Sequence, residues 1–169
     1  METLKAIHSR RSVRKYTAEK VSEQDLRKLL DAAMVAPSAG NAQPWHFIII
    51  DDPEILKQIP ALNQYAAMAK NASLAILVCA DLKLEKYPGF WVQDCAAAVQ
   101  NMLLAACDLG LGAVWTGIEP IPERGEGFAK LFKLPENVKP LGLVVIGHPD
   151  QQGKEEIRFK PDRVHRNQW

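Results

Sequence analysis

The sequence predicts a single α+β domain over residues 1–169, with a central mixed or antiparallel sheet of four to five strands flanked by helices. Four short runs rich in Val, Ile and Leu are typical of buried strands. The run at 21–36 has the periodicity of an amphipathic helix, and the run at 90–109 is apolar almost all round. With 47% hydrophobic residues, a chain of this length can bury about 70% of its unfolded surface, so a core is expected.

The first half of the chain begins with two predicted helices. A short helix is expected over 3–10, where apolar residues recur three apart. Ser22 followed three residues later by Asp25 is an acid-bearing variant of a capping box, and it predicts the start of the second helix. Pro37 predicts its end, because the residue before a proline disfavours helical geometry.

The four apolar runs are predicted strands separated by shorter elements. Pro53 predicts the start of a brief helix towards residue 59, and 125–134 predicts a helix before Pro135. No internal repeat, low-complexity tract or linker divides the chain, so one domain is expected. The expected strands are 45–51, 73–80, 113–116 and 141–147.

The helix at 90–109 predicts a second copy of the chain. A helix that is apolar all round must be buried on all sides, and one small domain rarely hides such a helix alone. We therefore expect a homodimer in which this helix packs against its counterpart. The charged tail from 155 to 169 carries isolated apolar residues, which predicts either an edge strand or an arm around a partner.

Charge and cysteine usage restrict the partners and the compartment. The formal net charge of +1 argues against nucleic acid and anionic membranes as partners. The N-terminus has no apolar signal core, and the run at 95–107 is too short and too interrupted to span a membrane, so a cytoplasmic protein is expected. Cys79, Cys95 and Cys107 lack C-x-x-C spacing and lie in apolar runs, which predicts buried free thiols.

Several kinds of chemistry have no support in the sequence. The four histidines show no metal-ligand spacing, so no metal site is predicted, and no G-x-S-x-G nucleophile motif is present. The glycines of L-G-L-G-A-V-W-T-G follow a helix and precede a strand, which is the reverse of the dinucleotide-binding order. No side chain is therefore predicted to be catalytic.

Two motifs remain as candidate binding sites. H-S-R-R-S-V-R-K-Y crowds four cations into six positions, where they either complement the end of a helix or bind an anion such as phosphate. P-S-A-G-N-A-Q-P-W, at 37–45, is a stiff loop between a helix and a strand. It is either a turn or a scaffold that presents Ser38, Asn41 and backbone groups to the edge of a planar ligand.

Taken together, four motifs resemble those of the nitroreductase family of FMN-dependent oxidoreductases. They are R-R-S-V-R-K-Y, P-S-A-G-N-A-Q-P-W, L-G-L-G-A-V-W-T-G and R-F-K-P-D-R-V-H, and together they cover nearly the whole chain. The resemblance implies a nitroreductase-like fold in an intertwined homodimer. Two FMN molecules would bind in the interface, each touched by both subunits, and the tail would cross onto the partner.

The resemblance also implies a role for each motif residue. Arg10, Ser12 and Arg158 would hold the FMN phosphate, with Arg11 beside them, and Arg14 would reach the pyrimidine edge, where a cation favours the reduced ring. The other subunit would contribute Pro37, Ser38, Ala39 and Asn41. Trp115, Thr116 and Gly117 would pass beneath the ring, with the Gly117 N–H directed at N5.

The implied reaction is ping-pong: NAD(P)H gives hydride to FMN, and an oxidised acceptor such as a nitroaromatic compound or a quinone then enters the same face. Many relatives carry a glutamate where Gly117 stands, and the short chain lacks the insertions that shape the acceptor pocket in longer relatives. Two alternatives stay open: a flavin-binding carrier or sensor without turnover, and an interaction module that meets nucleic acid through its basic cluster.

Overall fold

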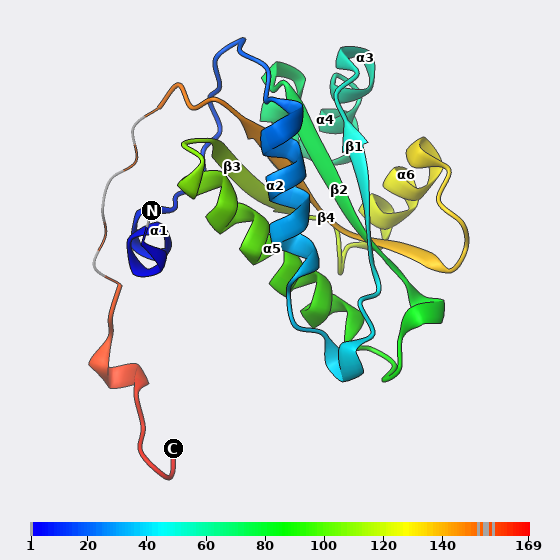
Figure 1. The fold of residues 1–169 in the computed structure, drawn as a ribbon. Coiled ribbons are helices and arrows are strands. Elements are labelled where there is room, and N and C mark those ends of the chain that lie inside the picture. The colour runs from blue at the N-terminus through cyan, green and yellow to red at the C-terminus, as the bar shows by residue number, and fades with distance from the viewer. Residues whose placement is uncertain (1, 152, 154–155, 157) are drawn as a thin grey trace.

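The protein folds around a four-stranded sheet with strand order β1-β2-β4-β3, in which every neighbouring pair is antiparallel (Figure 1). The computed structural model describes residues 2–151, 153, 156 and 158–169. All four predicted strands form, which confirms the α+β class and fixes the sheet as antiparallel. The strands are β1 (Trp45–Ile50), β2 (Leu74–Asp81), β3 (Gly112–Gly117) and β4 (Val138–Gly147).

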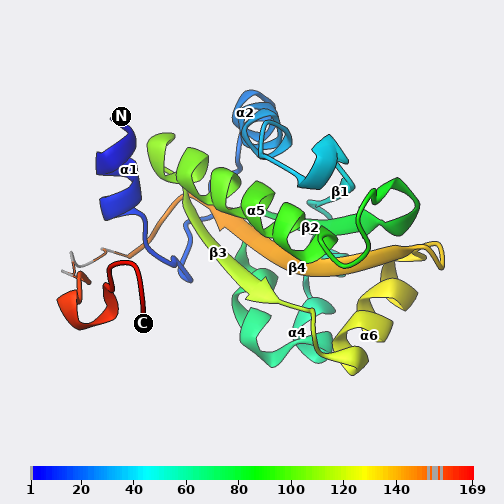
Figure 2. The ribbon, with the colours of Figure 1, turned by 90° about the horizontal axis from the view of Figure 1, so that it is seen from below.

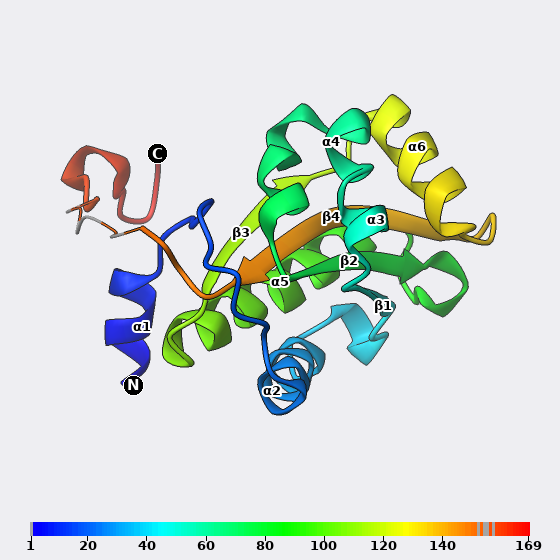
Figure 3. The same cartoon turned by 90° about the horizontal axis from the view of Figure 1, so that it is seen from above.

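Helices cover both faces of this sheet (Figures 2 and 3). On one face, α2 (Glu23–Met34) and α5 (Trp91–Asp108) pack over alternate residues of β2 such as Ile76 and Val78. On the other face lie α3 (Pro53–Leu56), α4 (Ile59–Leu62) and α6 (Pro122–Phe132). The central strands β2 and β4 are therefore buried on both sides, which explains their continuous apolar sequences.

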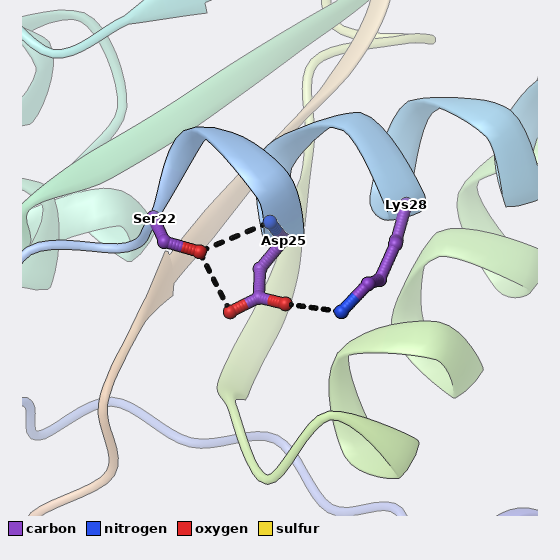
Figure 4. Close-up of polar contacts among 3 residues, drawn as sticks. All are labelled: Ser22, Asp25 and Lys28. Carbon is purple, nitrogen blue, oxygen red and sulfur yellow. Dashed lines mark hydrogen bonds and ion pairs between the residues drawn. The ribbon is translucent and has the colours of Figure 1, made fainter.

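The N-terminus of α2 confirms Ser22 as the predicted N-cap, although the Asp25 carboxylate bonds the Ser22 hydroxyl and not its backbone N–H as in a full capping box (Figure 4). The Ser22 hydroxyl accepts a hydrogen bond from the Asp25 N–H at 3.1 Å and lies 2.9 Å from the Asp25 carboxylate. The Lys28 ammonium donates to the same carboxylate at 2.9 Å. These bonds to Lys28 and Ser22 lower the pKa of Asp25, because they favour its charged form.

Within one chain, helix α5 is buried mainly on the face that it turns to the sheet. Its inner face lies on the sheet, and the Asn101 amide donates to the Ala32 carbonyl of α2 at 3.0 Å. Gln93 and Gln100 are exposed, and Leu104 is half-buried. Within one chain α5 is thus covered by the sheet and by α2, and its contact with a second copy stays a prediction.

The structure between α4 and β2 was not predicted from the sequence. Residues Gln64–Asn71 form 3₁₀ turns (η2) that pack against the second core, which is the hydrophobic cluster between the sheet and α3, α4 and α6. Such turns are too short for a recurring apolar pattern to predict them. Helix α6 begins at Pro122, three residues before the predicted 125, because proline is favoured in the first turn.

Of the cysteines, Cys79 and Cys95 are buried as predicted, and burial raises the pKa of both thiols to about 12. The prediction was wrong for Cys107, which is only half-buried.

Helix α1 and the C-terminal tail lie beyond the same end of the sheet (Figures 1 and 2). Helix α1 (Thr3–Ser9) is short, and the tail extends away from the body with one 3₁₀ turn, η4 (Pro161–Arg163). Over its described residues the tail forms no strand, so the edge-strand alternative is wrong there; residues 155 and 157 lie outside the described part. No described helix is long and apolar enough to cross a membrane.

Candidate functional site

The N-terminal motif docks onto the sheet through two of its residues, Val13 and Tyr16. The Val13 N–H donates to the Ala113 carbonyl on the outer edge of β3 at 3.0 Å. Glycines make room for both side chains: a Cβ on Gly112 would lie 2.5 Å from Val13 Cγ1, and a Cβ on Gly147 would lie 2.9 Å from the Tyr16 ring. The apolar residues of the motif therefore face the sheet, and its basic residues face outward.

The Tyr16 hydroxyl fastens this segment. It donates to the Val13 carbonyl at 2.6 Å and lies 3.2 Å from the Val145 carbonyl of β4. Burial raises the pKa of Tyr16, because the phenolate would lose its hydration. The hydroxyl thus stays protonated and keeps its role as a donor.

Five of the predicted site residues meet in one polar pocket of about 380 Å³ beside the end of α1. The Gln151 side-chain oxygen shapes its floor by accepting from the N–H groups of Arg14 and Lys15 at 2.9 and 3.1 Å. The pocket is lined by Arg10, Arg11, Ser12, Arg14, Gln151, Gly153, Glu156 and Arg158. Residues more than 140 positions apart in the sequence are therefore brought together.

Three of the four arginines of this pocket differ in their contacts. The Arg11 guanidinium donates to the carbonyls of His8 and Arg10 at 2.7 and 2.8 Å, which is the helix-end role that the sequence left open. Arg158 pairs with Glu156 at 2.7 Å and lowers the pKa of that carboxyl. The Arg10 side chain forms no hydrogen bond or ion pair with any described residue.

The donor set of this pocket fits a phosphate monoester. Among the described residues of the lining there are four guanidinium groups, one serine hydroxyl and one carboxylate, so these residues together carry an excess of positive charge. Guanidinium forks bind phosphate oxygens in pairs, and a hydroxyl adds one further donor. A dianion is the ligand that this arrangement satisfies best.

The pocket lies next to the outer edge of β3, because Ser12 of its lining forms a β-bridge with Ala113. Antiparallel neighbours alternate between hydrogen-bonded and non-hydrogen-bonded pairs. Since the Ala113 carbonyl faces this edge and the Ile118 N–H donates to Leu141 of β4 at 3.1 Å, the N–H and C=O of Gly117 also point to the free edge. The interval from Ala113 to Gly117 is about 13 Å long, at 3.3 Å per residue.

Two of the three predicted β3 residues are accessible along this interval. Trp115 is 38% exposed, and its indole lies so close over Gly142 that a Cβ on that glycine would overlap it. Thr116 is buried on the opposite face, where its hydroxyl donates to the Leu143 carbonyl at 3.3 Å. The edge is therefore lined by the backbone of Gly117 and the indole of Trp115, and the Thr116 side chain lies away from it.

A pair of donors that the sequence analysis missed holds the Gly117 carbonyl. The Asn63 amide donates to it at 3.2 Å, and the Arg124 guanidinium donates at 3.0 Å. Asn63 is 1% exposed, and its own side-chain oxygen accepts from the Tyr65 N–H at 3.1 Å. No local pattern marks these residues as neighbours of Gly117, because only the fold brings α6 and the residue between α4 and η2 to the end of β3.

The second predicted motif, residues 37–45, forms a rigid loop that leads into β1. Gly40, Asn41 and Gln43 all have positive φ, at 58°, 54° and 49°, a conformation that costs non-glycine residues free energy. The Ser38 hydroxyl accepts from the Gln43 N–H at 3.0 Å and closes the turn. The loop is thus a defined structure, as its composition predicts.

A buried carboxylate attaches this loop to α5. Asp94, which is 5% exposed in the first turn of α5, accepts a hydrogen bond from the Ala39 N–H at 2.9 Å. The Lys86 ammonium donates to the Gly40 carbonyl at 2.6 Å from the other side. No role for Asp94 was predicted from the sequence, although a carboxylate in an otherwise apolar helix was an available signal.

The loop and the basic pocket lie at opposite ends of α5. The loop contacts Asp94 near the start of the helix, whereas Ser9, next to the pocket, lies 3.6 Å from Cys107 near its end. Eighteen residues of α-helix are about 27 Å long. One chain therefore does not bring its own loop to its own pocket.

Side chains that could bind a metal ion form no cluster in the described part of the chain. Within the described ranges, no group of three or more His, Cys, Asp or Glu side chains comes close enough together to hold a metal ion.

Comparison with known proteins identifies relatives of this chain. The sequence profile described as the nitroreductase family matches residues 7–86 and 63–148. A protein of Methanothermobacter thermautotrophicus, provisionally named NADH dehydrogenase/NAD(P)H nitroreductase, is 50% identical over 169 residues, covering 100% of this chain and 88% of the relative. An FMN reductase [NAD(P)H] of Bacillus subtilis is 29% identical, covering 97% of this chain and 72% of the relative.

Solved structures have the same fold. A candidate nitroreductase of Desulfovibrio desulfuricans in complex with FMN superimposes with a TM-score of 0.85 and 35% sequence identity, covering 100% of this chain and 98% of the other.

Proposed function

Since this chain belongs to the nitroreductase family, we propose that it passes hydride from NAD(P)H through N5 of FMN to an oxidised small molecule, such as a nitroaromatic compound or a quinone, by a ping-pong mechanism. The protein is an NAD(P)H-dependent flavin oxidoreductase with FMN as its cofactor. The convergence of four arginines and a serine on one pocket, at the start of an open strand edge, carries the assignment of the cofactor site.

Arg10, Ser12 and Arg158 bind the phosphate in this proposal. Arg10 is the best placed of them, because its guanidinium has no competing partner among the described residues. Arg11 stands beside them and keeps the end of α1 in place through its bonds to carbonyls. Arg14 reaches the pyrimidine edge of the flavin, where its charge stabilises electron density on the ring.

The free edge of β3 holds the ring. Gly117 turns its N–H towards this edge, and a backbone donor there binds N5 without a side chain. Trp115 supplies an apolar surface beside it. FMN supplies the hydride exchange, and the protein fixes its position and charge.

The active unit is a homodimer of single-domain subunits. Pro37, Ser38, Ala39 and Asn41 reach the flavin of the other subunit, since the length of α5 keeps them from the pocket of their own chain. Phe159, at 76% exposed, and the fully exposed Trp169 are the apolar contacts of an arm that wraps the partner. The enzyme works in the cytoplasm on a small-molecule acceptor, without nucleic acid or membrane.

An anaerobic visible spectrum tests the proposal. The protein, purified and supplied with FMN, is recorded before and after addition of NADPH or NADH, and then after addition of a nitroaromatic acceptor. We expect a flavin spectrum that bleaches with the donor and returns with the acceptor. A bound flavin that does not bleach would support the carrier or sensor alternative, and a protein that binds no FMN would refute the assignment of the site.

A further inference from the structure

We propose that Arg124 selects acceptors that carry a negative charge beside the reducible group, such as a carboxylate on a nitroaromatic ring. This inference rests on the proposed function, because it uses Gly117 as the mark of the place where hydride is transferred. The Arg124 guanidinium donates to the Gly117 carbonyl at 3.0 Å, so it lies at the far end of the open β3 edge from the phosphate pocket.

The position of this cation is fixed before a ligand arrives. Besides its bond to Gly117, the guanidinium lies over the ring of Tyr65, 5.2 Å from the ring centroid. Tyr65 is 64% exposed and Arg124 is half-buried, so the pair lies at the surface of the chain. A side chain held by a carbonyl and by an aromatic face loses less conformational freedom when it binds an anion.

The charge of Arg124 is also uncompensated. Among the described residues, no carboxylate lies within ion-pair distance of it, whereas other basic side chains such as Arg27 and Lys57 have acidic partners on their own helices. A guanidinium carries five N–H donors, and the bond to Gly117 uses one of its nitrogens. The remaining donors suit a carboxylate, which a guanidinium can bind in a bidentate manner.

A matched pair of acceptors tests the effect of a negative charge on the acceptor by itself. 4-Nitrobenzoate and 4-nitrobenzamide have the same size and nitro group, and only the first is an anion. With the FMN-loaded protein and NAD(P)H, kcat/KM is measured for both, and the ratio between them is compared across variants. Arg124→Gln keeps a donor for the Gly117 carbonyl and removes the charge, Arg124→Lys keeps the charge, and Lys130→Ala removes a cation elsewhere on α6.

We expect Arg124→Gln to lower the ratio of kcat/KM for 4-nitrobenzoate to kcat/KM for 4-nitrobenzamide about five- to tenfold. Arg124→Lys should retain most of the preference, Lys130→Ala should leave it within about twofold, and added salt should reduce it in the unsubstituted protein. Calorimetric binding of benzoate and benzamide, which are not reduced, gives a readout that is independent of turnover. The Kd of benzoate alone should rise in Arg124→Gln.

Two results would overturn the inference. An unchanged ratio in Arg124→Gln would show that the guanidinium does not meet the acceptor. An equal loss with both acceptors would show that Arg124 acts only by holding Gly117. If the unsubstituted protein reduced neither nitro compound and its flavin did not bleach with NAD(P)H, the proposed function would fail, and this inference with it.

Discussion

Replacing Gly112 with alanine should damage the cofactor site from a distance. The new Cβ would lie 2.5 Å from Val13 Cγ1 and 2.8 Å from Val13 Cβ, closer than such atoms can approach. The N-terminal motif must therefore move off the edge of β3, which breaks the 3.0 Å bond from the Val13 N–H to Ala113 and the bridge between Ser12 and Ala113. The arginines of the basic pocket would shift with it.

The expected loss of stability is the sum of two costs, the overpacking at Val13 and the lost hydrogen bond to Ala113. Overpacking at a tight contact costs about 1 to 3 kcal/mol, and one backbone hydrogen bond contributes about 1 kcal/mol. We expect the free energy of unfolding to fall by about 2 to 4 kcal/mol and FMN affinity to fall by about tenfold. Urea unfolding of the apoprotein and titration of flavin fluorescence measure the two effects separately.

Two further variants make this test specific. Gly125→Ala, in α6, places its Cβ in open space, so it should leave FMN affinity unchanged and stabilise the helix by about 0.5 to 1 kcal/mol. Val13→Ala removes the nearest colliding atom, so it should recover about 1 kcal/mol when combined with Gly112→Ala. If Gly112→Ala unfolds at the same urea concentration as the parent and binds FMN equally well, the docking of Val13 described above is wrong.

Five other variants test three individual contacts. Arg10→Ala should weaken FMN binding by about 1.5 to 3 kcal/mol, and Arg11→Ala by less, because carbonyls already occupy the Arg11 guanidinium; equal Kd values for the two variants would contradict this ranking. Asp94→Ala should cost about 1 to 3 kcal/mol of stability by leaving the Ala39 N–H without its acceptor, whereas Asp94→Asn, which keeps an acceptor oxygen, should cost less in the same urea experiment. Tyr16→Phe should cost about 1 to 2 kcal/mol at neutral pH. Folding raises the pKa of Tyr16, so its hydroxyl contributes its full share of the free energy of unfolding below about pH 10 and a smaller share as the pH rises further. The free energy of unfolding of Tyr16→Phe should therefore fall less between about pH 9 and 11 than that of the parent. Parallel plots of this free energy against pH would show that Tyr16 titrates normally.

Local patterns were sufficient to predict most of the elements. The four strands are continuous apolar runs, and the Ser22 cap needs only residues three positions apart, so both follow from short-range physics. Segments without a period, such as Gln64–Asn71, could not be predicted, because contacts with the second core determine their 3₁₀ turns.

The sequence by itself determined which chemistry this chain carries: a cluster of cations with a serine, a stiff loop, and a strand that ends at Gly117. Only the tertiary structure decided how each residue is used. It turned Arg11 back onto the end of α1, left Arg10 in the pocket, and moved the Thr116 side chain to the opposite face. It also brought Asn63 and Arg124 to one carbonyl. The reason is physical: capping and periodicity act over a few residues, whereas hydrogen bonds between distant segments exist only after the sheet has fixed both partners in space.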